Sequence, residues 1–386
     1  MIAGIDVGAA FHVVYTIKSN TPTPKGKLYK IPAENQDKLV EVLRKDNIQK
    51  IILEPTGIWS IPVINRLYKE GFEVYIVHTT RFRAYARSHA NNKDDRTDAY
   101  LLAMYGYEYF SGYNHFKKLV LFRVNDRYIE SRQMWLLWKE REALKKQKNA
   151  EENRLREQVY IKDIKIAKKS IKKMIQWALD QEDELIKNRA EHIIKIEKDI
   201  KKVEKKMQEV VNSLPETKQM MELLLSIPEL GFITAYFITM QVIDIDRFNK
   251  RSFRAFIGVG RKREQSGTSK DWSKAAKSHR QFRALLYMAA MRLIAKHVPE
   301  WERYYTWQLS KVSVGKKAMW RVVSKLANII YGVLRNRERY KAKYVKEIVS
   351  DQQYEMAKEL LRGKRKKKRY KLKNKIKYKE ENLPVG

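Results

Sequence analysis

The first 110 residues alternate short apolar runs with amphipathic stretches, and this alternation constrains the fold more than any other feature. Three β-rich runs come first, and two more follow, each preceded by a stretch with helical spacing. Apolar residues at two-residue spacing predict strands, and those at three- and four-residue spacing predict helices. Strands are expected at residues 2–6, 12–17, 27–31, 51–54 and 74–77, and helices at residues 34–45 and from Ile61 to Leu67.

This order of elements, βββαβαβ, is that of an α/β RNase H-like fold, and two acids take notable positions in it. Asp6 lies inside the first apolar strand, and Glu54 ends the fourth. In that fold the fourth strand neighbours the first at about 4.8 Å. An unpaired carboxylate buried there costs several kcal/mol or has a raised pKa, and neither strand holds an evident Lys or Arg partner. Each acid taken singly is explained as well by a strand end that faces solvent.

A second pair of acids opens the next predicted helix. Asp95 and Asp98 are three residues apart, so their Cβ atoms lie roughly 5–6 Å from each other on one helix face. An isolated pair of this kind is most simply an acidic helix start in solvent, where negative charge is favoured. Together with Asp6 and Glu54, however, the pair makes a set of four acids that would need divalent metal. Two such ions can clamp the attacking and leaving oxygens of a phosphodiester.

Composition narrows both the metal and the partner. The 386 residues include no cysteine and only seven histidines, so a metal would be held by oxygen, which indicates Mg²⁺ or Mn²⁺. A net charge of +36 indicates a polyanionic partner, with nucleic acid first and an anionic membrane second. No apolar run approaches the roughly 20 residues of a membrane-spanning helix, and the start of the sequence resembles a strand rather than a signal peptide.

The rest of the sequence is mostly helical and predicts three further regions. A heptad pattern predicts a dimerising or spacing coiled coil, or alternatively an intramolecular helical hairpin. Its positions are Leu179, Ile186, Ile193, Ile200, Met207 and Leu214, with Ile196, Val203 and Val210 between them. The expected domains are residues 1–110 (catalytic), 111–215 (helical arm), 216–340 (C-terminal domain) and 341–386 (basic tail). The basic stretch Arg362 to Lys379 is expected to be disordered when free and to bind polyanions.

Two helical segments joined at Ser226 to Gly231 lead to an apolar stretch that ends at Gly260. A basic loop with a Ser-Gly pair is expected from Arg261 to Lys270. The next predicted helix, residues 281–297, is headed by Arg280 and Arg283.

Four of these stretches together resemble the DEDD transposases of prokaryotic insertion sequences, the IS110 group, to which Piv-like DNA invertases belong. Ile5 to Gly8 is similar to the first-strand Asp motif, and Glu54 to Gly57 to the family's E-x-T-G. Lys93 to Ala99 is similar to K-T-D-x-x-D-A. Gly258 to Gly267, with Ile227 to Gly231 upstream, is similar to the C-terminal G-L-x-P…S-G block. The order and spacing of the four stretches carry the resemblance.

The resemblance implies a RuvC-like N-terminal domain whose four acids hold Mg²⁺, with coiled-coil and helical parts behind it. It implies that a serine, by position Ser266, attacks DNA and forms a phosphoserine link, with Ser269 and Ser273 as alternatives. Gly267 would let DNA approach closely. Further expected nucleic-acid contacts are Lys93, Arg96, Arg261, Lys262, Arg263, Arg280 and Arg283. The implied partners are double-stranded DNA (element ends and target), a guide (bridge) RNA and other copies of the chain, in the cytoplasm of a prokaryote at its nucleoid.

Two other functions remain open at the level of sequence. A RuvC-like endonuclease or Holliday junction resolvase would use water as its nucleophile and leave Ser266 a structural role. A non-catalytic nucleic-acid scaffold would need only the positive charge. The four acids argue against the scaffold, because a pure polyanion binder gains nothing from clustered negative charge.

Overall fold

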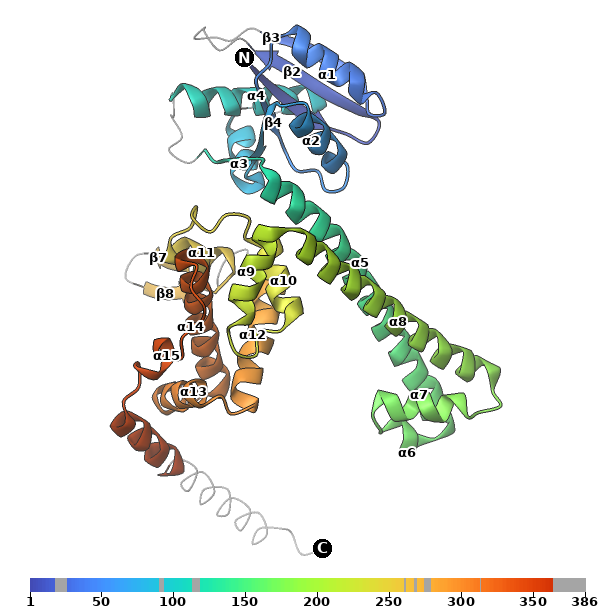
Figure 1. The fold of residues 1–386 in the computed structure, drawn as a ribbon, viewed down its shortest axis with the longest axis vertical. Helices are drawn as coiled ribbons and strands as arrows, with labels where there is room; N and C mark the ends of the chain where they lie inside the picture. Colours follow the sequence, from blue (N-terminus) through green and yellow to red (C-terminus); the bar gives the residue numbers. More distant parts are fainter. Residues whose placement is uncertain are drawn as a thin grey trace, which may run out of the picture. The chain divides into compact units, whose positions relative to one another are not determined.

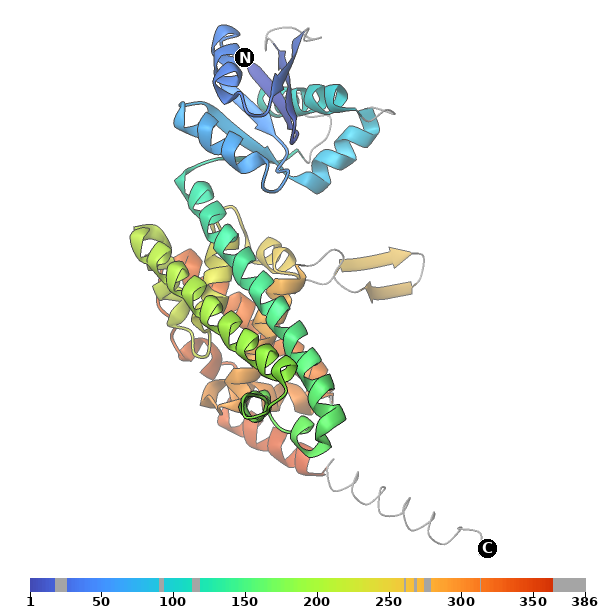
Figure 2. The same cartoon turned by 90° about the vertical axis from the view of Figure 1, so that its right-hand side faces the viewer.

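The structure is a computed structural model of one chain (Figures 1 and 2). It describes residues 1–17, 26–89, 94–112, 119–259, 262–266, 269–273, 279–312 and 314–363, with the backbone alone for 262–266 and 269–273. The chain divides into two compact units, Met1–Gln133 and Met134–Gly386. The four domains expected from the sequence are a finer division and stay a prediction.

A six-stranded mixed sheet forms the centre of the first unit, in the order β3-β2-β1-β4-β5-β6. The strand pairs β1–β2 and β2–β3 are antiparallel, β1–β4 and β4–β5 are parallel, and β6 is added antiparallel to β5. The strands are β1 Ile2–Val7, β2 Phe11–Ile17, β3 Gly26–Pro32, β4 Lys50–Leu53, β5 Glu73–Val77 and β6 Leu121–Arg123. The first five strands confirm the predicted order, which is that of the RNase H-like fold. The three-residue β6 is an addition that the sequence pattern does not predict.

Helices cover both faces of this sheet. They are α1 Gln36–Lys45, α2 Ser60–Lys69, α3 Thr79–His89 and α4 Asp95–Ser111. Figure 2 shows α1 and α2 on one face and α4 on the other. The strand residues between them are apolar and fully buried, as Ile5, Ile51 and Leu53 show. Strands that are buried on both faces read as continuous apolar runs, which explains why β4 consists of Lys-Ile-Ile-Leu.

Two glycines let α4 approach the sheet closely. A Cβ atom on Gly4 in β1 would lie 2.2 Å from the carbonyl oxygen of Ala99 and 2.3 Å from the amide nitrogen of Ala103. A Cβ atom on Gly106 in α4 would lie 2.5 Å from Cγ1 of Ile52. Neither position has room for a side chain, so the seat of α4 on β1 and β4 depends on both glycines.

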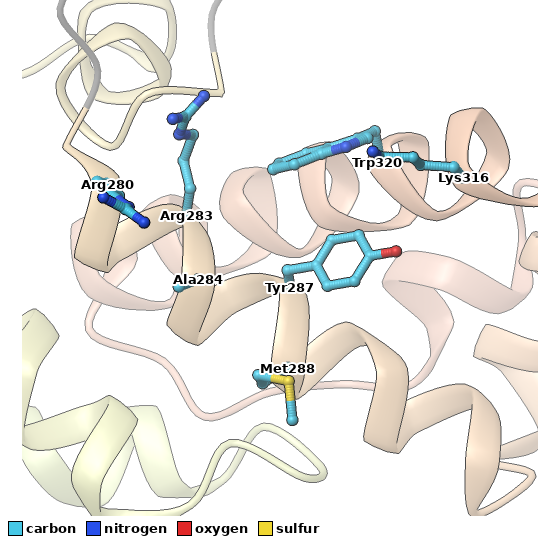
Figure 3. Close-up of a pocket in the computed structure, with 7 residues that line it drawn as sticks. All are labelled: Arg280, Arg283, Ala284, Tyr287, Met288, Lys316 and Trp320. Atoms are coloured by element: carbon cyan, nitrogen blue, oxygen red, sulfur yellow. The ribbon is translucent and has the colours of Figure 1, made fainter. Parts of the chain in front are cut away.

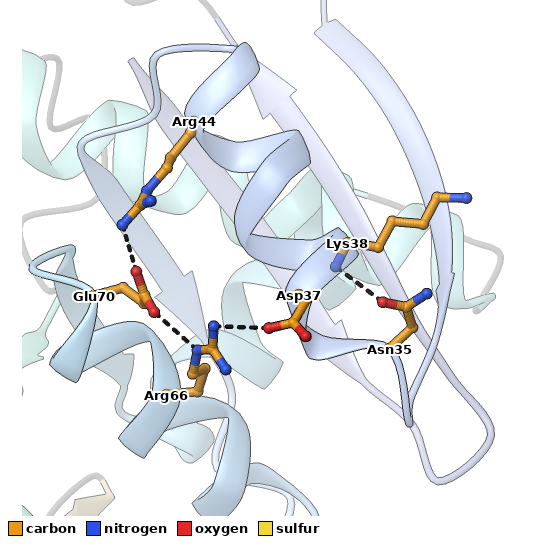
Figure 4. Close-up of polar contacts among 6 residues, drawn as sticks. All are labelled: Asn35, Asp37, Lys38, Arg44, Arg66 and Glu70. Carbon is orange, nitrogen blue, oxygen red and sulfur yellow. Dashed lines mark hydrogen bonds and ion pairs between the residues drawn. The ribbon is translucent and has the colours of Figure 1, made fainter.

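Charged side chains join α1 to α2 (Figure 4). Arg66 donates from Nε to Glu70 at 3.0 Å and pairs with Asp37 at 2.8 Å, while Arg44 also pairs with Glu70. Asn35 caps α1 by accepting a hydrogen bond from the backbone nitrogen of Lys38 at 3.0 Å. These pairs lie at the surface, so we expect each to contribute well under about 1 kcal/mol.

The second unit is almost wholly helical. Its elements, the first of which begins before the boundary between the units, are α5 Asp126–Lys162, α6 Ile164–Ala167, α7 Ile171–Leu179, α8 Glu184–Ser213, α9 Pro215–Leu225, α10 Phe232–Gln241, α11 Lys250–Phe256, β7 Lys262–Ser266, β8 Ser269–Ser273, α12 Arg280–Ala295, α13 Pro299–Val312, α14 Gly315–Asn336 and α15 Lys343–Lys346. Residues 351–363 are also helical. In the described part of the chain, no helix has the length and apolar character that crossing a membrane requires.

The long helices α5 and α8 form an antiparallel hairpin within the chain. Arg141 donates from Nε to Glu204 at 2.7 Å, Lys148 pairs with Glu197 at 2.6 Å, and Lys162 pairs with Asp183 at 2.5 Å. Four residues of the heptad pattern, Ile186, Ile193, Ile196 and Met207, are buried in this single chain. The structure therefore has the intramolecular hairpin that the sequence left as an alternative, and a coiled coil between chains stays a prediction.

Helices α9 to α15 pack around one large core, whereas α6 and α7 pack with α5 and α8 in a smaller one. The fully buried aromatic side chains of the large core are Tyr236, Phe237, Phe253, Phe282 and Trp301. The hydroxyl of Tyr236 donates to the carbonyl oxygen of Met134 in α5 at 2.9 Å, so the helical hairpin is anchored to this core. Trp301 and Ile330 are buried in it, whereas Trp307 and Trp320 are only partly buried.

Candidate active site

Asp6 and Glu54 lie at the same end of two neighbouring strands. β1 and β4 are parallel, and their last paired residues are Ile5 and Leu53. Asp6 follows in β1, and Glu54 directly follows β4. Both residues are partly exposed rather than buried. Because adjacent parallel strands lie about 4.8 Å apart, the structure brings these two predicted acids to one edge of the sheet.

The second pair of acids lies at the start of α4. Asp94 is the N-cap, and its carboxylate accepts a hydrogen bond from the backbone nitrogen of Thr97 at 2.7 Å. That bond holds the pKa of Asp94 below its usual range. Asp95 and Asp98 follow in the first turn, with Asp95 exposed and Asp98 partly buried. The acidic helix start predicted from the sequence is confirmed.

The direction of α4 carries its first turn toward Asp6. Gly106, near the end of the helix, lies over Ile2 at the beginning of β1, and Ala99 lies over Gly4. The helix therefore runs against the strand, at 1.5 Å per residue against about 3.3 Å per residue. Asp6 is two residues beyond Gly4 in the strand. Because the helix runs in the opposite direction, the helix residues nearest Asp6 are those just before Ala99, which include Asp98.

The four acids supply oxygen ligands of the kind that a hard divalent ion prefers. Within the described ranges, however, no three Asp, Glu or His side chains lie close enough together to form a metal site. Glu54 instead faces Arg83 of α3, with 3.7 Å between Arg83 Nε and Glu54 Oε1. The backbone positions of the acids thus lie at the same end of the sheet, but their side chains do not form a metal site. That the four acids hold a metal ion stays a prediction.

A loop after β4 is fixed to the end of β1. The hydroxyl of Thr56 donates to the carbonyl oxygen of Val7 at 3.2 Å. Gly57 has a φ of 67°, a left-handed conformation that glycine adopts without steric cost. The stretch from Glu54 to Gly57 thus connects the end of β4 to the end of β1, the two strands that carry Asp6 and Glu54. This contact explains why the motif contains a Thr and a Gly at these positions.

A cavity of about 540 Å³ lies beside the start of α4, lined by Val13, Leu28, Lys30, Asp94, Asp95 and Arg96. Lys30 in β3, Val13 in β2 and Asp6 in β1 are paired across the three strands. Arg96, a predicted nucleic-acid contact, and Lys30, which was not among the predicted site residues, both border this cavity. Pairing the predicted third strand with the second would have placed Lys30 in line with Val13 and Asp6, and so would have indicated Lys30 as a residue near the acids. Arg83 gave no such signal, because α3 was not predicted.

The predicted basic loop around Ser266 is a β-hairpin instead. β7 and β8 pair antiparallel, with Ser266 opposite Ser269 and Lys262 opposite Ser273. The expectation of a loop was wrong, and its physical reason is that the two strands contain Lys, Glu and Asp, which are depleted in strands. Ser266 and Ser269 therefore lie at the turn end of the hairpin, and Ser273 lies at its open end. The predicted contacts Lys262 and Arg263 belong to β7, whereas Lys93, Arg261 and Gly267 lie outside the described residues.

Comparison with known proteins decides the family. No curated protein matches the sequence. Residues 3–161 match the IS110-type DEDD domain, described as a transposase, and residues 221–306 match the Transposase IS116/IS110/IS902 family. The chain is a DEDD transposase of the IS110 family. It is therefore a DNA strand-transfer enzyme, and DNA is its substrate.

The predicted site residues of this transposase fall into two groups, one in each matched segment. The first match contains Asp6, Glu54, Asp95 and Asp98, and the DEDD domain that it identifies is of a divalent-metal-dependent kind. The second match contains the β7–β8 hairpin with Ser266, and the start of α12 with Arg280 and Arg283. The two parts of the predicted chemistry thus lie in the two matched segments.

Proposed function

We propose that this transposase cuts and joins DNA through a phosphoserine intermediate formed by Ser266, with Asp6, Glu54, Asp95 and Asp98 holding Mg²⁺ or Mn²⁺. The observation that carries the proposal is the placement of Asp6, Glu54 and the first turn of α4 at one end of the sheet. The two family matches, which contain the acids and the serine respectively, support the pairing of these parts in one enzyme.

The chemistry explains why both parts are needed. A serine hydroxyl is a weak nucleophile at neutral pH, and Ser266-Gly267-Thr268 contains no His or Lys that could act as a local base. When bound, a divalent ion polarises the phosphate and stabilises its developing negative charge. Ser266 Oγ forms the bond to phosphorus, its proton passes to a carboxylate, and one DNA oxygen leaves. The serine link conserves the energy of the phosphodiester, so the strands can be rejoined.

A water-attacking nuclease or junction resolvase is the second candidate. It is favoured by the fact that all four acids lie in one unit, whereas Ser266 lies in the other. A carboxylate-rich RNase H-like site can activate water directly, and in that case no covalent protein–DNA species forms.

A guide RNA and a homo-oligomer are further parts of the proposal. The net charge of +36 suits the simultaneous binding of DNA and RNA. The resemblance to the bridge-RNA-guided transposases supplies the role of the RNA, which is to select target and donor DNA by base pairing.

The deciding experiment traps the covalent intermediate. Purified protein, Mg²⁺, the RNA of its own element and end-labelled DNA are mixed and separated on a denaturing gel. We expect a protein–DNA band that Ser266→Ala and Asp98→Asn both remove, and that Ser269→Ala and Ser273→Ala retain. Omitting the RNA should abolish joined product. Cleaved DNA without a covalent band, with Ser266→Ala still active, would instead establish water as the nucleophile.

A further inference from the structure

A second cavity lies in the C-terminal helices, between α12 and α14 (Figure 3). It has a volume of about 530 Å³, within the roughly 300–1,000 Å³ range of small-ligand pockets. Its chemistry is divided between cations and aromatic rings. Arg280 and Arg283 come from the first turn of α12, Tyr287 and Met288 from the next turns, and Lys316 and Trp320 from α14.

The cationic part of the cavity is formed by Arg280, Arg283 and Lys316. No Asp or Glu is among the described residues that line the cavity. Arg280 and Lys316 are exposed. The Nε atom of Arg283 is shielded from solvent and has no hydrogen-bond partner among the described residues. Arg280 and Arg283 lie on the same side of the cavity and fit an anion with several acceptor oxygens, such as a phosphate, while Lys316 lies beside Trp320 (Figure 3).

The aromatic part lies next to the cations. The rings of Tyr287 and Trp320 are 5.3 Å apart between centroids and tilted by 48°. Both side chains are partly buried, so each keeps some surface open to the cavity, and Met288 beside them is 51% exposed. From Arg280 to Tyr287 is seven residues, or about 10 Å along the helix. The spacing suits a chain that places phosphate at one end of the cavity and a flat ring at the other.

We propose that this cavity binds an unpaired nucleotide, with its phosphates on Arg280 and Arg283 and its base stacked against Trp320 and Tyr287. Stacking requires an open base face, which a continuous duplex hides and a single strand offers. The inference rests on nucleic acid as the partner in the proposed function but does not depend on Ser266. A single-stranded part of the DNA and an unpaired part of the guide RNA share this chemistry, and the test separates them.

The test separates stacking from charge. Binding of the full chain to single-stranded dT and U oligomers and to a duplex is measured by fluorescence anisotropy over a range of salt concentrations. Trp320→Leu should weaken single-strand binding about five- to a hundredfold at every salt concentration and leave the duplex unchanged. Trp320→Phe, which keeps a ring, should stay within about threefold of the wild type. Arg280→Gln with Arg283→Gln should lower the slope of log K against log salt by about 1.4.

Because so basic a chain can bind oligomers at other surfaces, a second measurement locates the site of binding. Oligomers that carry 5-iodouracil are photocrosslinked and the adducts mapped by mass spectrometry. We expect adducts at Trp320 or Tyr287, on the DNA oligomer, the RNA oligomer or both, which identifies the source of the nucleotide. Tyr160→Leu, at an aromatic residue of α5 that is 55% exposed, is the control and should change neither the affinity nor the adducts.

Unchanged single-strand affinity in Trp320→Leu, or adducts absent from both Trp320 and Tyr287, would overturn the proposal. Neither readout requires strand transfer, so a failure here is distinguishable from a failure of the phosphoserine assay.

Discussion

At the scale of single residues, burial alone does not distinguish a catalytic acid from a structural one. Asp46, at the end of α1, has a side chain that is only 8% exposed. Its carboxylate accepts hydrogen bonds from Thr16 and Tyr29, both at 2.8 Å, and from Lys27 at 3.2 Å. With three donors on its carboxylate, Asp46 has little capacity left to bind a metal ion, and no sequence pattern marks it. Its partners are residues of β2 and β3 that only the folded sheet brings near.

Asp46 should make stability depend on pH. Burial raises the pKa of this carboxyl, but the hydrogen bonds from Thr16, Tyr29 and Lys27 outweigh burial and leave the pKa below its usual range. The stabilisation is therefore present above the unfolded pKa of about 3.9 and is lost as pH falls through the folded value. We expect Asp46→Asn to cost about 1–3 kcal/mol at pH 7 and much less near the folded pKa, by urea unfolding. Asp37→Asn, at a side chain 85% exposed, is the control and should change little at either pH.

Gly4 gives a second prediction at this scale. In Gly4→Ala the new methyl group would meet the backbone of α4 at Ala99 and Ala103, and backbone cannot move aside cheaply. We expect a loss of stability of at least about 1–3 kcal/mol and a loss of strand transfer, because α4 carries Asp95 and Asp98. Gly332→Ala, in α14, where the added Cβ would have no atom within 4 Å beyond its chain neighbours and its own helix backbone, should instead stabilise the protein by up to about 1 kcal/mol. Equal thermal stability of the two variants would contradict this account of the α4 seat.

At the scale of elements, the sequence predicts what periodicity can encode. The five strands and two helices of the first unit follow from apolar spacing, and the acidic start of α4 follows from its capping residues. The strand β6 is too short to carry a pattern, and the strands β7 and β8 carry side chains typical of loops. The heptads of α8 identify a buried face correctly, but periodicity does not reveal whether the partner is α5 of the same chain or α8 of another.

Ile193 tests which partner the heptad face has. Its side chain is fully buried in the core of the α5–α8 hairpin, with Leu155 and Val159 of α5. We expect Ile193→Ala to cost about 2–5 kcal/mol of stability without changing the mass of the particle measured by light scattering. Leu185→Ala, on the same helix but 63% exposed, should alter neither. A fall in oligomer mass in Ile193→Ala alone would show instead that this face joins separate chains.

At the scale of the whole molecule, charge dominates. The chain has 81 Lys and Arg against 45 Asp and Glu, so it attracts polyanions whatever their sequence, and selectivity has to come from local features. The acids of the sheet edge, the β7–β8 hairpin and the α12–α14 cavity are the local features from which selectivity can come. Sequence composition identified the class of partner, whereas the cavity required the folded helices, because Arg283 and Trp320 are distant along the chain.

The basic tail should supply affinity without selectivity. Residues 364–386 contain eleven Lys and Arg and two Glu. Ending the chain at Gly363 should weaken binding to unrelated DNA duplexes at low salt and lower the salt slope by about 0.9 for each phosphate that the tail had neutralised. Strand transfer on the element's own DNA at low salt should persist. Loss of sequence preference in the truncated chain, measured by competition between specific and unrelated duplexes, would show that the tail takes part in recognition.

The α5–α8 hairpin has a consequence for how relatives of this transposase diverge. Its cross-helix pairs, such as Arg141 with Glu204 and Lys162 with Asp183, follow one antiparallel register. Seven residues inserted into each helix at matching points would preserve that register on both sides of the insertion and add about 10 Å. Arm length is thus a quantity that evolution, or an engineer, can change in heptad steps while the helix faces at both ends keep their partners.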